Sequence, residues 1–112
     1  MISRRPSIFI YTHHPDPDFL REIRAGIEEE GIFSEVFEQE ESDVNRLAFQ
    51  AAADSMLGSG IGLSEVDAAL QMKGLQIGKN VEFWHMPTYG QCRAMGADSA
   101  RIIKKLGLKA AD

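Results

Sequence analysis

The chain has 112 residues, 44% of them hydrophobic and 26% charged, which is the composition of one globular domain spanning residues 1–112. Its net charge of −5 argues against a nucleic-acid binder, because phosphate contacts require a basic surface. There is no membrane-spanning run and no secretion signal, and the single Cys92 cannot form an internal disulfide, so we expect a cytoplasmic protein.

The first predicted elements are a strand and a helix. An apolar, β-rich run at residues 6–11 predicts the strand, and the THHPDPD that follows predicts a loop. Asp18 is the expected N-cap of a helix that reaches Glu30, and Gly31 can take the left-handed conformation that stops it.

A second strand–helix unit follows. Residues 34–38 alternate as a strand does, and Ser42 or Asp43 can cap a helix running to about Leu57 with small residues on one face. The next segment, residues 58–64, predicts a short strand that contains several glycines.

The last third of the chain is expected to complete the sheet. Residues 66–72 are either a further strand or a short helix, residues 81–85 predict another buried strand, and a final helix covers residues 90–106. Strands that alternate with helices indicate an α/β fold with three layers, α/β/α, around a mostly parallel sheet of about four to five strands.

Acidic and basic residues are unevenly distributed along the chain. Between Arg24 and Arg46 there are eight acidic residues and no lysine or arginine. Such runs are either solvated faces or an acidic surface that receives a cation or a basic partner. The carboxyl-terminal part has the opposite bias, with Arg93, Arg101, Lys104, Lys105 and Lys109 against Asp98 and Asp112.

Three consecutive glutamates, residues 28–30, end the first predicted helix, where the helix dipole disfavours anions. With steps of about 100° per residue, Glu29 lies about 200° round from the core-facing Ile27 and points most directly away from the protein body. Glu28 can pair with Arg24 one turn earlier, whereas the residue one turn before Glu29 is an alanine. Glu29 is therefore either an exposed carboxylate with no specific role or a ligand for a cation.

Three other patterns have a structural and a functional interpretation. The run His13-His14-Pro-Asp16 contains metal-ligand types without a zinc-site spacing, and adjacent histidines are expected to diverge, so a polar loop is favoured over a binding site. The glycines of residues 58–62 favour close packing over a phosphate loop, because they match neither nucleotide motif. Cys92 is expected to be a buried, inert thiol rather than a nucleophile paired with His85.

Three segments carry a resemblance to a known family. They are REIRAGIEEEGI at residues 21–32, FQAAADS at residues 49–55 with GIG at residues 60–62, and RAMGADSARIIK at residues 93–104. In this order and spacing the chain resembles the small subunit of the reactivating factor for coenzyme-B12-dependent diol and glycerol dehydratases. The same fold family includes the medium subunit of the dehydratase itself, which is a longer chain.

The resemblance implies a chaperone-like subunit without catalytic activity. Its partner would be a large ATPase subunit, with two copies of each, and the factor would release damaged cobalamin from an inactivated dehydratase by subunit exchange. The resemblance also implies that Glu29, the central glutamate of its run, ligates a magnesium ion of the large subunit, and no cofactor would bind tightly to this chain alone. The loop THHPDP and Asp98 depart from the family, which more often has an Asp-Gly type turn and an asparagine there.

Other functions stay open at this point. The chain could bind a small molecule, such as a corrinoid or a nucleotide, through the loop after the first strand, or be a stand-alone paralogue of the medium subunit. A weaker alternative is a metalloenzyme that uses His13, His14 and Asp16. The sequence does not separate service to diol dehydratase from service to glycerol dehydratase, or decide whether the protein works in a bacterial microcompartment.

Overall fold

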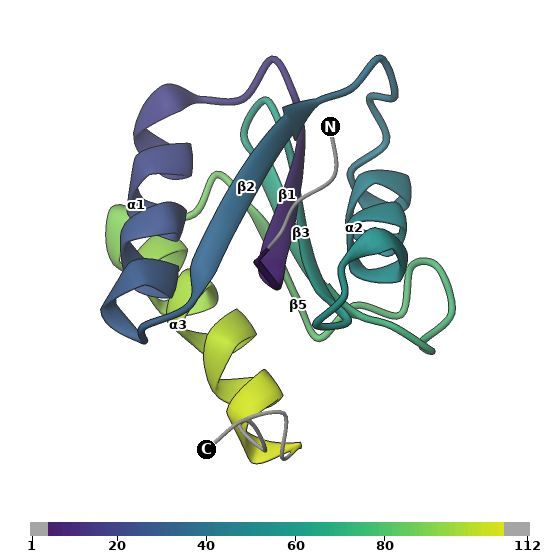
Figure 1. Ribbon diagram of the computed structural model, residues 1–112. Helices are drawn as coiled ribbons and strands as arrows, with labels where there is room; N and C mark the ends of the chain where they lie inside the picture. Colours follow the sequence, from purple (N-terminus) through teal and green to yellow (C-terminus); the bar gives the residue numbers. More distant parts are fainter. Residues whose placement is uncertain (1–4, 107–112) are drawn as a thin grey trace.

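The computed structural model describes residues 5–106, which form one sheet of five strands with three helices (Figure 1). No helix in this part of the chain has both the length and the apolar character needed to cross a membrane. In chain order, the elements are β1 (Ser7–His13), α1 (Pro17–Glu29), β2 (Phe33–Glu38), α2 (Val44–Asp54), β3 (Ser59–Ser64), β4 (Asp67–Met72), β5 (Glu82–His85) and α3 (Tyr89–Lys105).

The strand order in the sheet is β2-β1-β3-β4-β5. Strand β1 pairs in parallel with β2 and β3, while β4 pairs antiparallel with β3 and β5, so β4 alone runs against the other four. The predicted α/β fold with a mostly parallel sheet is confirmed. The sequence allowed either a strand or a short helix at residues 66–72, and the structure has strand β4 there. A tight turn connects β3 to β4.

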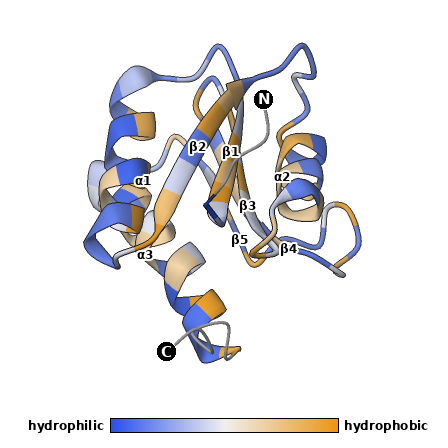
Figure 2. Ribbon diagram, viewed as in Figure 1, coloured by the Kyte–Doolittle hydropathy of each residue, from blue (hydrophilic) through white to orange (hydrophobic). Residues whose placement is uncertain are grey.

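The sheet is the middle of three layers. Helices α1 and α3 cover one face and α2 covers the other, as Figure 1 shows. Figure 2 shows that the loops following β1 and β2, at the top of the view, are hydrophilic. The core on the α1–α3 side includes Ile8, Ile10, Ile23, Ile61 and Met95, all fully buried, and the core on the α2 side includes Tyr11, Leu47 and Ala51.

The glycines of β3 allow α2 to approach the sheet closely. A β-carbon on Gly60 would overlap the backbone of Ala51 and Ala52, and one on Gly62 would lie 2.6 Å from the backbone nitrogen of Ala48. Only a residue without a side chain fits there, so the close-packing interpretation of this glycine-rich stretch is confirmed.

Three sequence expectations were wrong in detail. Asp16, not Asp18, caps α1, because Pro17 takes the first helical position and the Asp16 carboxylate accepts hydrogen bonds from two backbone N–H groups at 2.9 and 3.1 Å. Helix α2 ends at Asp54, before the predicted Leu57. Strand β5 is exposed rather than buried, with Trp84 36% accessible, because it is the last strand of the sheet.

Candidate functional site

Helices α1 and α3 cross with their backbones in contact. A β-carbon on Gly26 would overlap the carbonyl oxygen of Arg93, and one on Gly96 would overlap the carbonyl oxygen of Ile23. The two glycines therefore face each other's helix, and any side chain there would force the helices apart. This crossing fixes which side chains of the two helices lie next to each other.

The crossing brings basic side chains of α3 to the glutamates of α1. Arg93 donates hydrogen bonds from Nε to Glu22 Oε1 at 3.0 Å and from Nη1 to Glu29 Oε2 at 2.6 Å. Arg101 and Lys104 both donate to Glu30, at 3.0 and 3.2 Å. Lys104 and then Arg101 lower the pKa of Glu30 from its ordinary value. The last turn of α1 has no basic residue of its own, so α3 supplies the cations that this end of the helix requires.

Glu29 is exposed, as predicted, but it already forms an ion pair with an arginine, Arg93. Its side chain is 58% accessible and one of its oxygens is held by Arg93, while Oε1 takes part in no hydrogen bond among residues 5–106. The predicted pair of Glu28 with Arg24 is also absent from this part of the chain, because Arg24 donates to the side chain and the carbonyl of Ser34. Lys109 and Asp112 lie outside the described residues.

The sequence missed Arg93 because it lies 64 residues from Glu29. A helical wheel contains only neighbours within one helix, and Arg93 belongs to another. Two signals point to the pairing in retrospect. The acidic and the basic segments have opposite charge, and each carries a glycine, Gly26 or Gly96, within a helical stretch where glycine is otherwise unfavourable.

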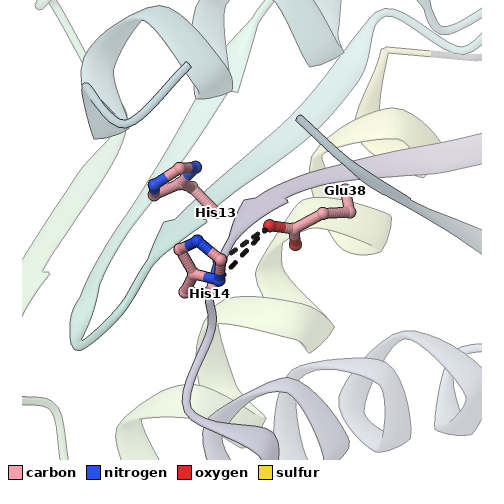
Figure 3. Close-up of side chains that lie close together, drawn as sticks. All are labelled: His13, His14 and Glu38. Atoms are coloured by element: carbon pink, nitrogen blue, oxygen red, sulfur yellow. Dashed lines mark hydrogen bonds and ion pairs between the residues drawn. The ribbon is translucent and has the colours of Figure 1, made fainter. Parts of the chain in front are cut away.

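A second cluster lies at the carboxyl ends of β1 and β2. Figure 3 shows His13, His14 and Glu38 side by side, and one potential ligand atom from each lies within 4.8 Å of the others. The expected divergence of the two histidines is wrong, since their ring centroids are 4.3 Å apart. His14 has a φ of 46°, a left-handed conformation that costs an L-residue about 1–2 kcal/mol. That turn ends the alternation of the strand and brings the second ring back beside the first.

Hydrogen bonds hold two members of this cluster in place. His13 Nδ1 lies 3.0 Å from the carbonyl oxygen of Gln39. Glu38 accepts hydrogen bonds from the Thr12 hydroxyl at 2.7 Å and from the backbone N–H of His14 at 2.9 Å. The His14 N–H and the Thr12 hydroxyl lower the pKa of Glu38, which keeps it ionised. Asp16 is not part of the cluster, because its carboxylate is used as the cap of α1.

A pocket of about 360 Å³ lies between the end of β1 and α2. It is lined in part by Tyr11, Arg46, Gln50 and Ile77, and its volume is near the lower limit for small-molecule sites. The Tyr11 hydroxyl donates to Asp54 at 2.5 Å, and burial together with this carboxylate raises the pKa of Tyr11. The phenol therefore stays protonated.

Cys92 is buried on the inner side of α3, as predicted. Burial raises the pKa of its thiol to about 11, so little thiolate forms at neutral pH. His85 is hydrogen-bonded at 2.6 Å to Asp67. This arrangement favours the inert thiol over a nucleophilic pair.

The family model described as the dehydratase medium subunit matches residues 5–109. The chain belongs to this family. Two solved structures are similar to this chain over almost their whole length. A glycerol dehydratase reactivase chain has a TM-score of 0.84 and 25% identity, with 88% of this chain and 92% of that chain covered. A chain of a diol dehydratase-reactivating factor complexed with ADP and Mg²⁺ has a TM-score of 0.83 and 28% identity, with 89% and 94% covered.

No curated protein sequence matches the chain significantly. The family and structure matches confirm the resemblance to reactivating-factor small subunits that the three sequence segments indicated, and they support a role in dehydratase reactivation. The family match contains both the α1–α3 charge cluster and the His13–His14–Glu38 cluster. The first lies on segments that carried the resemblance, and the two histidines of the second lie in the loop region that departs from it.

Proposed function

We propose that this chain is the small, non-catalytic subunit of a dehydratase-reactivating factor. Together with a large ATPase subunit it would release damaged cobalamin from an inactivated diol or glycerol dehydratase by subunit exchange in the cytoplasm. The observation that carries the proposal is the match to chains of two reactivating factors, which covers more than nine-tenths of each. Cobalamin would be handled by the complex and not by a site on this chain.

Glu29 is the proposed docking ligand. Its carboxylate is exposed, and it is held at one oxygen by Arg93, while the described part of the chain leaves Oε1 available. Mg²⁺ is commonly bound by one or two carboxylates with water or phosphate completing the shell. A magnesium ion on the ATPase subunit would take the available oxygen, while Arg93 keeps the carboxylate oriented. Two copies of each subunit would assemble in this way.

A metal-bridged interface suits a subunit that must be displaced. Exposed ion pairs such as Arg93–Glu29 contribute only roughly 0.2–1 kcal/mol, so the α1 surface can exchange partners at little cost. A single carboxylate–metal bond would make docking depend on the ion and on the nucleotide state of the ATPase subunit. The charge cluster on α1 and α3 would provide the scaffold for that bond.

The test is calorimetric titration of the large subunit with wild type, Glu29→Gln and Glu28→Gln, each in Mg²⁺ and in EDTA. Glu28 is the matched control, because it is exposed, adjacent and free of ion pairs among residues 5–106. We expect Glu29→Gln to bind about tenfold or more weakly in Mg²⁺ and to lose its response to EDTA, because glutamine is a poor metal ligand. Glu28→Gln should behave as wild type.

Equal affinity of all three proteins in both solutions would remove the metal bridge and leave the subunit role intact. Failure of the wild type to bind the large subunit at all would remove the role itself. The two failures are therefore distinguishable.

The pocket beside α2 is the observation behind the second candidate function, a small-molecule binding domain. Its volume of about 360 Å³ suits a small ligand better than a corrin ring. Equilibrium dialysis of the isolated chain against cobalamin and against ATP separates the two candidates. Tight binding of either compound by this chain alone would favour the second, and no binding is expected for the reactivating-factor subunit.

A further inference from the structure

We propose that His13, His14 and Glu38 form a binding site for a divalent transition-metal ion, with Zn²⁺ as the favoured ion. The proposal is independent of the reactivation role and of the magnesium contact assigned to Glu29. It rests on the convergence of three ligand-type side chains from the ends of β1 and β2, which Figure 3 shows.

The geometry is close to what zinc requires. With Zn–N bonds of about 2.0–2.1 Å and tetrahedral angles, neighbouring ligand atoms lie about 3.3 Å apart. The three ligand atoms here already lie within 4.8 Å of one another. The His14 side chain is 75% accessible, so its ring can rotate by the small amount needed without disturbing the core.

The hydrogen bonds around the cluster prepare two of its members for metal binding. A carbonyl oxygen only accepts, so the contact with Gln39 places the proton of His13 on Nδ1 and leaves the lone pair of Nε2 available. Metal-binding histidines usually donate their other N–H in this way. Glu38 is fixed by Thr12 and by the His14 backbone, and each of its oxygens retains a lone pair.

The backbone also fits a binding role. His14 is a non-glycine residue in the left-handed region, and such conformations persist where the surrounding structure enforces them, often at functional sites. Here the enforcing contact is the Glu38 carboxylate, which accepts the His14 N–H at 2.9 Å. The carboxyl end of β1 also borders the point where the strand order reverses, between β1 and β3, where α/β sheets place their ligands.

The ligand types select the ion. Two imidazoles and one carboxylate suit Zn²⁺ and its neighbours, whereas Mg²⁺ prefers oxygen ligands. Three protein ligands leave a fourth position of a tetrahedral ion for water. The site therefore differs in chemistry from the carboxylate of Glu29, which lies at the carboxyl end of α1.

The experiment is a titration of the full, untagged chain with Zn²⁺ in competition with a chromogenic chelator, together with Co²⁺ absorption spectra as a report of coordination geometry. The chain has only three histidines, so His85 provides an internal control. The proteins are wild type, His14→Gly, Glu38→Gln and His85→Ala. Glycine tolerates the positive φ of residue 14, so His14→Gly removes the ring without straining the backbone.

We expect one Zn²⁺ per wild-type chain, unchanged binding in His85→Ala, and affinity lower by more than about tenfold in both His14→Gly and Glu38→Gln. The Co²⁺ spectrum of the wild type should show the intense visible bands of tetrahedral coordination, and His14→Gly should lose them. Less than one ion per wild-type chain, full affinity in His14→Gly, or equal losses in His85→Ala and His14→Gly would each overturn the proposal.

Discussion

The α1–α3 charge cluster and the β1–β2 edge cluster are built in opposite ways. In the first, regular helices cross at Gly26 and Gly96, and the charges meet because the helical repeat places them along the crossing. In the second, a single left-handed residue, His14, departs from regular strand geometry and gathers the ligands. One site therefore depends on the packing of whole elements, whereas the other depends on one local conformation. Substitutions at each site should affect one without affecting the other.

The largest effect should come from Gly96→Ala. Its β-carbon would overlap the carbonyl of Ile23, so α1 and α3 must separate, and overpacking of this kind costs about 1–3 kcal/mol of unfolding free energy, here near the upper value. Urea denaturation measures the loss. We also expect Zn²⁺ binding at the β1–β2 edge to survive in the folded fraction, because β1 and β2 keep their pairing.

Gly90→Ala is the matched control in the same helix. Among the residues that the structure describes, a β-carbon there would have only the Thr88 hydroxyl within reach, at 3.9 Å, so alanine should be neutral or stabilise by up to about 1 kcal/mol through its higher helix propensity. Equal destabilisation by the two substitutions would mean that the close crossing of α1 and α3 is not what makes position 96 sensitive.

Thr12→Val probes the other cluster and should cost less. It removes the hydroxyl that donates to Glu38 at 2.7 Å, with a loss of about 1 kcal/mol in unfolding free energy. Since Glu38 is then less well fixed, Zn²⁺ affinity should fall by about tenfold. Docking to the large subunit should be unchanged, because Glu29 and Arg93 are not touched.

Thr12→Ser keeps the hydroxyl and provides the control. The chelator competition and calorimetric titrations described above measure both properties. A loss of large-subunit binding in Thr12→Val with retained zinc affinity would contradict the separation of the two clusters.

The smallest effect should be a change in pH dependence from Asp98→Asn. Burial and the adjacent Asp98 carboxylate raise the pKa of Glu82 from 4.5 to about 7. The folded state therefore holds this proton more tightly than the unfolded state, so the free energy of unfolding decreases as pH rises from about 4.5 to about 7 and stays lower above that range.

Asp98→Asn removes the neighbouring charge and should flatten that decrease. Because Glu82 is partly exposed and screened, we expect a gain of less than about 1 kcal/mol at about pH 8, and little change at about pH 4. Urea denaturation of both proteins at the two pH values measures it. An identical pH dependence would show that the two carboxylates do not interact, and the exposed Arg101–Asp98 pair, at 4.0 Å, is too weak to mask the result.

Much of the fold could be predicted from the sequence because its elements have clear periodicity and clear ends. The alternation in residues 34–38 and the apolar stripe of α1 both gave elements close to those observed. The exposure of β5 could not be predicted, since an apolar run has the same sequence pattern in an edge strand as in a central strand. The choice of Asp16 over Asp18 as cap depended on recognising Pro17 as the first helical residue.

The two sites were predictable to different degrees. The outward direction of Glu29 follows from helix geometry alone, but its partner Arg93 depends on how two helices pack. The convergence of His13 and His14 was not predictable, because it depends on a φ of 46° and on a hydrogen bond that the His14 N–H donates to Glu38, 24 residues away. Adjacent side chains of a regular strand point to opposite faces, so the sequence predicted that the two histidine rings diverge.

The backbone contact of α1 with α3, made possible by Gly26 and Gly96, has a consequence for engineering. The spacing of α1 and α3 is set by main-chain atoms. The charged side chains around the crossing can therefore be exchanged between the two helices without changing that spacing. Reversing Glu29 and Arg93 together would retain their mutual attraction and invert the sign of the docking surface. Such a charge-reversed subunit, together with a large subunit that carries the complementary change, would form a pair that does not bind the native proteins in the same cell.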